Sequence, residues 1–271
     1  QHVADKEPGR PDTATVGVLN VYESDFDWPE GARVKALRVV RLYAKDTFHK
    51  ADPAVGAGKQ SLVRGVLGEA PVEADGSAFF EVPAGVPLYF QALDEKGMAI
   101  QSMRSDTYAH PGERLMCVGC HESKHDAPAL PAGMPIALQR APSQLTPPFE
   151  TADPVCYAEL IQPVLDRNCV TCHEESTEEK AIPLTGVPAK KNGWSESYSS
   201  LIPYMWVLVN YNGSISENGS RSIAGEVGAR VSKVWKLLEK GHHDVDLAPE
   251  DRKRLIVWLD LNSNFYGRYS D

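Results

Sequence analysis

Residues 34–43 are Val-Lys-Ala-Leu-Arg-Val-Val-Arg-Leu-Tyr, and this stretch decides the fold class of the first part of the chain. Its apolar side chains roughly alternate with basic ones, which is typical of a β-strand with one buried face. Segments of similar character lie on both sides of it: Thr15–Tyr22, Ser61–Leu67, Ala78–Val82, Leu88–Leu93 and Met98–Met103. Turn sequences such as Asp75-Gly76-Ser77 and Glu95-Lys96-Gly97 separate several of them. Short strands at this spacing predict an N-terminal antiparallel β-sandwich-like domain.

The later part of the chain has a helical pattern. Apolar residues recur at helical spacing in Val155–Arg167. A second helix is predicted for Ser232–Lys240, and a third for Pro249–Leu261, which begins with proline and two acids. We also expect a short helix within Glu196–Val209. Seven prolines in residues 127–154 exclude a long helix there and predict an extended segment over the surface.

Composition excludes several classes of protein. The 271 residues are 42% hydrophobic and 24% charged, as in ordinary globular proteins. With 28 basic and 37 acidic residues the net charge is −9, which argues against nucleic acid or an anionic membrane surface as the main partner. No apolar run approaches the roughly 18–20 residues of a membrane-spanning helix. Five cysteines are too few for a disulfide scaffold of this length.

Four of the five cysteines form two copies of one motif. They are Cys117-Val118-Gly119-Cys120-His121 and Cys169-Val170-Thr171-Cys172-His173. This spacing is typical of c-type haem attachment. Two thiols three residues apart can form thioethers with the two vinyl groups of a haem, and the adjacent imidazole can ligate the iron.

Zinc binding and dithiol redox chemistry explain the two Cys-x-x-Cys-His motifs less completely than haem attachment does. A zinc site with four cysteine ligands would leave the histidine after each pair unexplained. A redox dithiol would be expected at the start of a helix after a βα pattern. Two copies therefore predict two haem c groups, each with its iron. The attachment residues are Cys117, Cys120, Cys169 and Cys172, and the iron ligands within the motifs are His121 and His173.

The ligands on the opposite sides of the irons are less determined. For the second haem the candidates are His242, His243 and Met205, and we favour His242 because it lies in a short connection between two helices. A bis-histidine iron has a low potential and suits an electron carrier. For the first haem the sequence leaves the opposite ligand open. The candidates are His125, His110, Met103 and Met116, and an unoccupied position is the remaining alternative.

The chain is therefore predicted to be an α+β protein with four parts. Residues 1–15 form a tail, and residues 16–126 form a β-rich domain that ends in the first haem site. Residues 127–153 form a proline-rich linker, and residues 154–271 form a mainly α-helical cytochrome c-like domain with the second haem. Bacteria attach haem c outside the cytoplasm, so we expect a periplasmic or extracellular, exported protein. The N-terminus lacks signal-peptide features, so we expect a leader already removed or a piece of a longer protein.

Several segments resemble the haem-bearing region of the hydrazine synthase alpha subunit family. They include Gln101–Ser105, Pro111–Glu122, Arg140–Ser143, Ile161–Cys169, Gly241–Val245 and Trp258–Asn262. The resemblance implies two c-type haems, a β-rich middle domain, and a helical C-terminal domain with a bis-histidine haem whose distal ligand is His242. No propeller repeat, which that family carries before this region, is present.

The resemblance also bears on the first haem. In that family a tyrosine four residues after the motif histidine ligates the iron, and the motif histidine faces a zinc ion. Here that position is His125. The departure makes His125 a candidate axial ligand that replaces or opposes His121.

Three functions remain in competition. The favoured one is an exported dihaem cytochrome that transfers electrons to a redox partner protein. The second is a haem enzyme, either hydrazine synthase-like or reducing peroxide or a nitrogen oxide, with catalysis at the first haem and the second haem as relay. The third is a sensor of a diatomic gas. Polar residues near the first motif could serve an open iron, although the sequence assigns no catalytic residue: Arg104, Tyr108, His110 and Glu113. The substrate and the oligomeric state stay open.

Overall fold

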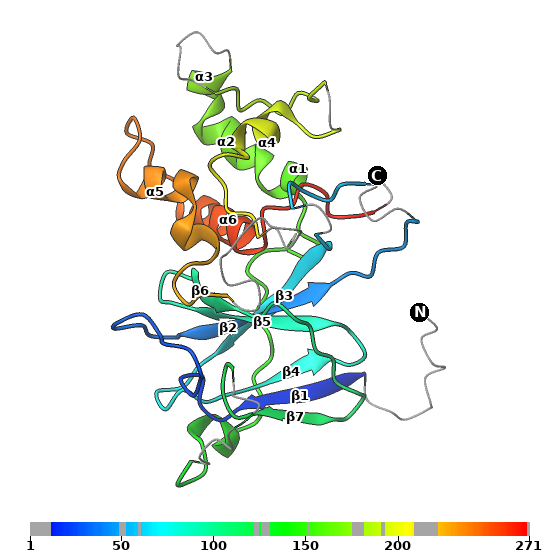
Figure 1. Cartoon of the computed structure of the whole chain (residues 1–271), viewed down its shortest axis with the longest axis vertical. Coiled ribbons are helices and arrows are strands. Elements are labelled where there is room, and N and C mark those ends of the chain that lie inside the picture. The colour runs from blue at the N-terminus through cyan, green and yellow to red at the C-terminus, as the bar shows by residue number, and fades with distance from the viewer. Residues whose placement is uncertain are drawn as a thin grey trace.

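The computed structural model describes residues 12–48, 53–58, 61–121, 125, 131–150, 152–174, 182–190, 193–208 and 222–269. Two sheets and a group of helices are stacked along the long axis of the molecule (Figure 1). The strands are β1 Thr13–Val18, β2 Ala36–Leu42, β3 Arg64–Pro71, β4 Ala78–Pro83, β5 Leu88–Leu93, β6 Ala99–Ser102 and β7 Arg114–Cys117. The helices are α1 Tyr157–Leu160, α2 Gln162–Asn168, α3 Val170–His173, α4 Glu196–Leu201, α5 Lys233–Glu239 and α6 Pro249–Asp260, with 3-10 turns η1 Ile136–Gln139 and η2 Gly228–Val231.

The N-terminal part is a two-sheet domain, as its alternating pattern predicts. One sheet has the order β4-β1-β7 and the other β3-β2-β5-β6. Every pair of neighbouring strands is antiparallel except β1 and β7, which are parallel with Val18 opposite Cys117. The sequence did not indicate β7, because four residues are too few to establish an alternation. A parallel neighbour requires a long crossover connection, and here strands β2 to β6 and the irregular residues 103–113 separate β1 from β7.

Strand β2 is buried on both faces, which corrects the expected polar face. Leu37 and Val39 pack between the two sheets, while Val40 joins the core of the helical part. Arg38, expected on a solvated face, is only 1% exposed because α6 covers that face. Its guanidinium bonds Asp260 at the end of α6, with 2.9 Å between Nη1 and Oδ2. This ion pair joins the sheet domain to the helices.

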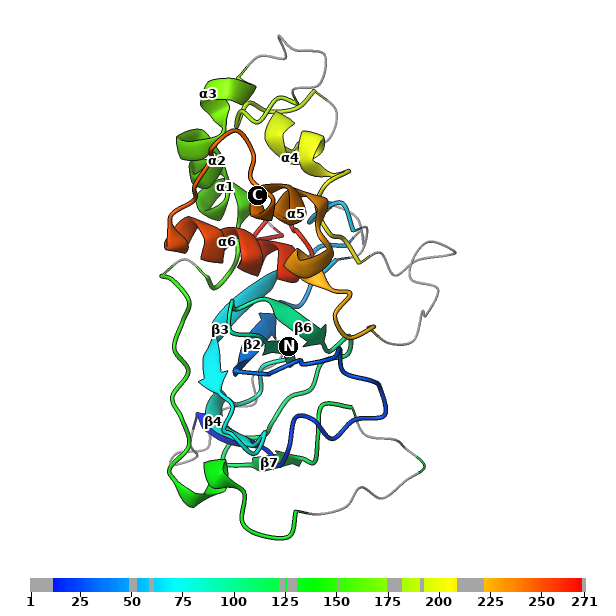
Figure 2. The same ribbon diagram turned by 90° about the vertical axis from the view of Figure 1, so that its left-hand side faces the viewer.

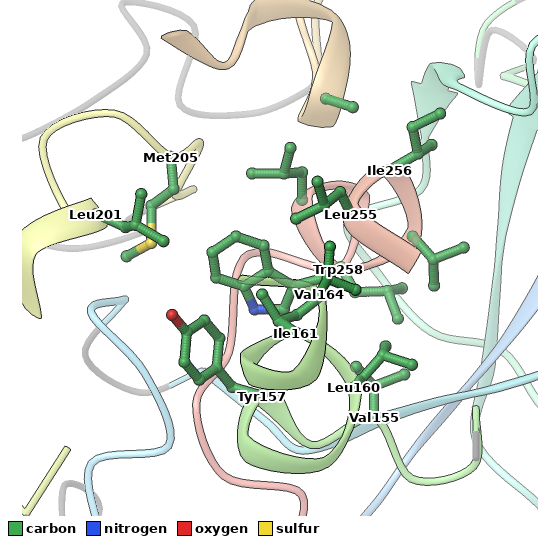
Figure 3. Packing of buried hydrophobic residues seen from close by; sticks show 14 of the residues in the cluster. Val155, Tyr157, Leu160, Ile161, Val164, Leu201, Met205, Leu255, Ile256 and Trp258 are labelled. Carbon is green, nitrogen blue, oxygen red and sulfur yellow. The ribbon is translucent and has the colours of Figure 1, made fainter. Parts of the chain in front are cut away.

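The helical part has its core around Trp258 of α6 (Figure 3). Tyr157 and Tyr198 pack against its indole with ring centroids 5.3 and 6.4 Å away. Elements α5 and α6 coincide within a residue or two with the predicted helices. The predicted helix 155–167 is divided into α1 and α2, with Pro163 in the first turn of α2, and α4 ends at Leu201, ahead of Pro203. Long stretches between these short helices are irregular, so a mainly helical domain is not what the described residues form.

Residues 131–150, the described part of the proline-rich segment, run along the side of both sheets toward the helices (Figure 2). Its backbone bridges Glu69 of β3 at Thr146 and Phe80 of β4 at Ser143. Extended backbone with these bonds holds the segment on the surface, in agreement with its composition. No helix among the described residues is long and apolar enough to cross a membrane.

Candidate haem-binding sites

The first Cys-x-x-Cys-His motif is fixed by backbone contacts with residues 19–25. Cys117 is the last residue of β7, and its carbonyl accepts a hydrogen bond from the N–H of Leu19 at 2.9 Å. The N–H of Cys120 donates to the carbonyl of Glu23 at 3.1 Å. A Cβ at Gly119 would lie 1.9 Å from that same carbonyl oxygen, so this middle position of the motif requires glycine.

The histidine of this motif is oriented by a carboxylate. His121 forms a parallel β-bridge with Ser24, and its Nδ1 lies 2.6 Å from Oδ1 of Asp25. A carboxylate accepts hydrogen bonds, so Nδ1 of His121 is the donor in this contact and Nε2 is the ring nitrogen that is left for a metal ion. Histidines that ligate metals characteristically donate their other N–H in this way.

A cavity of about 780 Å³ lies beside this motif. Cys117, Cys120 and His121 line it, together with apolar side chains from the interior of the sheets. Cavities of about 300–1,000 Å³ commonly hold organic ligands. Two thiols, an imidazole nitrogen and a cavity with both apolar and polar walls are the donor set and the space that a covalently bound haem would require.

The structure separates the other candidates at the first site. Met103 and Arg104 line the cavity. Met116 does not reach it but is 41% exposed and packs over Gly17. Outside the cavity lining, the rings of Tyr108 and His110 contact each other at 5.3 Å, and the carboxylate of Glu113 accepts a hydrogen bond from the His110 N–H. His125 is exposed and its sequence neighbours lie outside the described residues, so its role stays a prediction.

The second motif follows α2 directly and forms the short helix α3. The N–H groups of Cys172 and His173 both donate to the carbonyl of Cys169 at 3.1 Å. Burial, with Cys172 nearby, raises the pKa of the Cys169 thiol to about 11. Neither Cys169 nor Cys172 is joined in a disulfide, and Cys172 is exposed.

The second motif is tied to α6 through one carboxylate. Asp251 accepts hydrogen bonds from Arg167 at 2.6 Å and from Asn168 at 3.1 Å, the two residues that precede Cys169. Burial alone would raise the pKa of Asp251, but these bonds and the nearby guanidinium charges hold it below its ordinary value. The carboxylate therefore stays ionised and fixes the end of α2.

His173 and His242 come together although 69 positions of sequence separate them. Their ring centroids are 6.1 Å apart, with an angle of 36° between the ring planes. Two imidazoles on opposite sides of one metal ion have centroids about 6 Å apart if the metal–nitrogen distance is about 2 Å. Nδ1 of His173 lies 2.8 Å from the carbonyl oxygen of Ile182, which leaves Nε2 available. The pair suits an iron held between two histidines.

His242 is presented by a tight turn after α5. Gly241, His243 and Asp244 have φ angles of 87°, 47° and 59°, so three of four consecutive residues adopt the left-handed conformation. Non-glycine residues rarely adopt it, and they do so mainly in turns and at functional sites. Burial, with His243 and His173 nearby, lowers the pKa of His242, which favours the neutral imidazole that binds metals.

The rival ligands at the second site are placed differently. His243 packs edge-on against His242 at 4.6 Å, on the same turn. Met205 is 8% exposed and lies next to Leu201 in the helical core (Figure 3). Within the described ranges, no group of three or more histidine, cysteine or acidic side chains is arranged to hold a further metal ion.

Two residues of these sites do not stand out in the sequence. Asp25 lies in a loop, and Asp251 looks like an ordinary acid at a helix start. No local signal identifies Asp25, because its partner is 96 positions away and the contact arises from the bridge at Ser24. For Asp251 the acid–base complementarity with Arg167 is visible, but only the packing of α6 against α2 shows that they meet.

Comparisons with known proteins agree with one another. Residues 32–122 match the family described as the hydrazine synthase alpha subunit middle domain, a span that contains the first motif. Hydrazine synthase subunit alpha of Kuenenia stuttgartiensis is 22% identical over 319 residues, which cover 86% of this chain and 38% of that protein. A chain of the solved Kuenenia stuttgartiensis hydrazine synthase matches with a TM-score of 0.65 and 22% identity, over 97% of this chain and 45% of that one. This chain thus spans less than half the length of the relatives it matches. The comparisons thus find similarity to the alpha subunit of hydrazine synthase in residues 32–122 and, at 22% identity, over most of the chain.

Proposed function

We propose that the chain is a dihaem c-type cytochrome that transfers electrons through two covalently bound haems. The observation that carries the proposal is the pair His173 and His242, with ring centroids 6.1 Å apart, in the part of the fold that holds the free thiols Cys169 and Cys172. A histidine pair around an iron, with no open position, suits a carrier that only gains and loses electrons. The helices α1–α6 then serve as a cytochrome c-like domain.

The protein residues have separate roles in this function. Cys117, Cys120, Cys169 and Cys172 form the thioether bonds, while His121, His173 and His242 offer imidazole nitrogens. The haems supply one-electron chemistry when bound. The protein orients each motif histidine through its Nδ1 and fixes the second motif to α6 through Asp251.

An exported location and a redox partner complete the proposal. Haem c attachment takes place outside the bacterial cytoplasm, so the chain would act in the periplasm or outside the cell. Its net charge of −9, to which haem propionates would add, favours a partner that presents a basic patch. The negative charge of the chain would raise the rate of association with this partner more than it would raise the affinity of the complex.

The test is a spectroscopic count of haems and ligands. The chain is produced with a signal peptide in a host that attaches haem c, and pyridine haemochrome spectra with intact mass give the number of covalent haems. We expect two per chain, with at least one low-spin iron that does not bind CO or cyanide. A chain that leaves this host without covalent haem contradicts the proposal.

A second candidate function is catalysis at the first haem, with the second haem as relay. Arg104 favours it, because this cation lies in the wall of the cavity next to Cys117, Cys120 and His121 and would offer hydrogen bonds to a small polar molecule. The relationship to hydrazine synthase points in the same direction. A high-spin first haem that binds CO in the reduced protein would support catalysis, whereas two low-spin, ligand-inert haems would exclude it.

A further inference from the structure

The two motif histidines have different hydrogen-bond partners at the same ring atom. Nδ1 of His121 faces the carboxylate of Asp25 at 2.6 Å, while Nδ1 of His173 faces the backbone carbonyl of Ile182 at 2.8 Å. One partner is an anion and the other a neutral dipole. Bonds to a charged acceptor are about twice as strong as neutral ones.

We propose that Asp25 is a positioning residue for His121 and that this contrast sets the two haems to different reduction potentials. The inference rests on the proposed binding of haem at both motifs, with His121 as a ligand of the first iron. A carboxylate on Nδ1 raises the basicity of the imidazole, and a more basic ligand stabilises the oxidised iron more than the reduced one. Asp25 therefore lowers the potential of the first haem relative to a haem whose histidine meets only a carbonyl.

The backbone around Asp25 holds the carboxylate in place. The N–H of Asp25 donates to the carbonyl of His121 at 2.9 Å, and the adjacent Ser24 forms the parallel bridge to His121. The ring of Phe26 covers the imidazole edge-on at 6.3 Å. The bridge holds the backbone of Asp25 next to that of His121, which places the carboxylate within reach of Nδ1.

The test is a potentiometric titration of each haem in the Asp25→Asn variant. Asparagine keeps the size of the side chain and removes its charge. Loss of a hydrogen-bond partner of a ligating histidine typically changes metal-site equilibria about 10- to 100-fold. We therefore expect the ratio of reduced to oxidised first haem, at a given potential, to rise at least tenfold. For a one-electron couple that is a midpoint about 59 mV higher or more. The second haem should keep its midpoint.

The matched control is Asp27→Asn, which removes the same charge two residues away; both aspartates are exposed. It should leave both midpoints unchanged. An equal shift in the two variants, or none in Asp25→Asn, would overturn the inference. If Asp25→Asn fails to retain the first haem, Asp25→Glu replaces it, since glutamate keeps the charge but displaces the carboxylate by one methylene. A first-haem midpoint equal to that of the wild type would then overturn the inference.

The haem count separates this inference from the function on which it rests. A wild-type chain without covalent haem contradicts the proposed function itself. Two covalent haems in the wild type and in Asp25→Asn, with unchanged midpoints, contradict only the role of Asp25.

Discussion

At the scale of single residues, the histidines and the glycine of the motifs carry the sharpest consequences. His173 has its partner ring 6.1 Å away and its other nitrogen bonded to a carbonyl, so it is oriented on both sides. His242 and His243 lie on one turn, but only His242 has a ring contact with His173 among the described residues. The two neighbouring histidines should therefore behave differently when replaced.

His242→Ala should convert the second haem from low-spin to high-spin, because it removes the imidazole opposite His173. EPR of the oxidised protein and CO binding to the reduced protein measure the change. His243→Ala is the matched control and should leave the spectrum of the second haem low-spin. The reverse pattern would assign the ligand to His243 instead.

Gly119→Ala should destabilise the protein by about 1–3 kcal/mol, the usual cost of forcing a methyl group into a packed site. The added Cβ would stand 1.9 Å from the Glu23 carbonyl, so residues 19–25 would have to move away from the motif. Urea denaturation measures the loss. The control is Gly133→Ala, whose Cβ would meet nothing within 4 Å and which should leave the midpoint of unfolding nearly unchanged.

At the scale of elements, α6 connects most of the molecule. Its first turn holds the second motif through Asp251, its middle carries Trp258 in the core, and its last residue, Asp260, reaches the sheet. The pKa of Asp251 is lowered, so the folded state binds this proton less readily than the unfolded state. The stability that it contributes is present above its ordinary pKa of 3.8 and is lost as the pH falls through the lower folded value.

Asp251→Asn should therefore lower the free energy of unfolding by about 1–2 kcal/mol near neutral pH. The difference from the wild type should shrink as the pH falls below about 4, where the wild-type carboxylate becomes protonated. Urea titrations at the two pH values measure it. Glu250→Gln, at a neighbouring exposed acid that pairs with Arg254, should cost under about 0.5 kcal/mol. A constant difference at all pH values would contradict the role of the charge.

The elements also show how far sequence reasoning reaches. Strands β2, β4 and β5 and helices α5 and α6 follow from local periodicity and from their end signals, because each is long enough to display its pattern. Strand β7 and the burial of Arg38 do not, since they depend on which distant segment lies alongside. The Cys-x-x-Cys-His motifs are local and therefore visible in the sequence, whereas the carboxylate of Asp25 enters its site through tertiary structure alone.

At the scale of the whole molecule, the sheet domain and the helices form one cooperative unit through the Arg38–Asp260 pair. Arg38 also bonds Gln91 and the carbonyl of Gly97, and Asp260 accepts the N–H of Ala99 and Ala229. These partners come from both halves of the chain. Because the carboxylate and the guanidinium are both buried, the loss of either one would leave the other without its counter-charge.

Arg38→Met should lower the free energy of unfolding by about 3–5 kcal/mol, because it leaves a buried carboxylate without its counter-charge. Sheet and helix signals in circular dichroism should still disappear together. Arg41→Met on the same strand is the control: that side chain is 37% exposed and 3.9 Å from Asp153, so its loss should cost under about 1 kcal/mol. Two separate transitions in the wild type would contradict the single unit.

The position of β1 has a practical consequence for handling the chain. The strand that comes first in the sequence is the central strand of its sheet, with β4 on one side and β7 on the other. Truncation past residue 12 would therefore remove the strand on which the first Cys-x-x-Cys-His motif is mounted, although that motif lies about a hundred residues later. Recombinant forms of the chain should keep Thr13–Val18 and carry any affinity tag ahead of it.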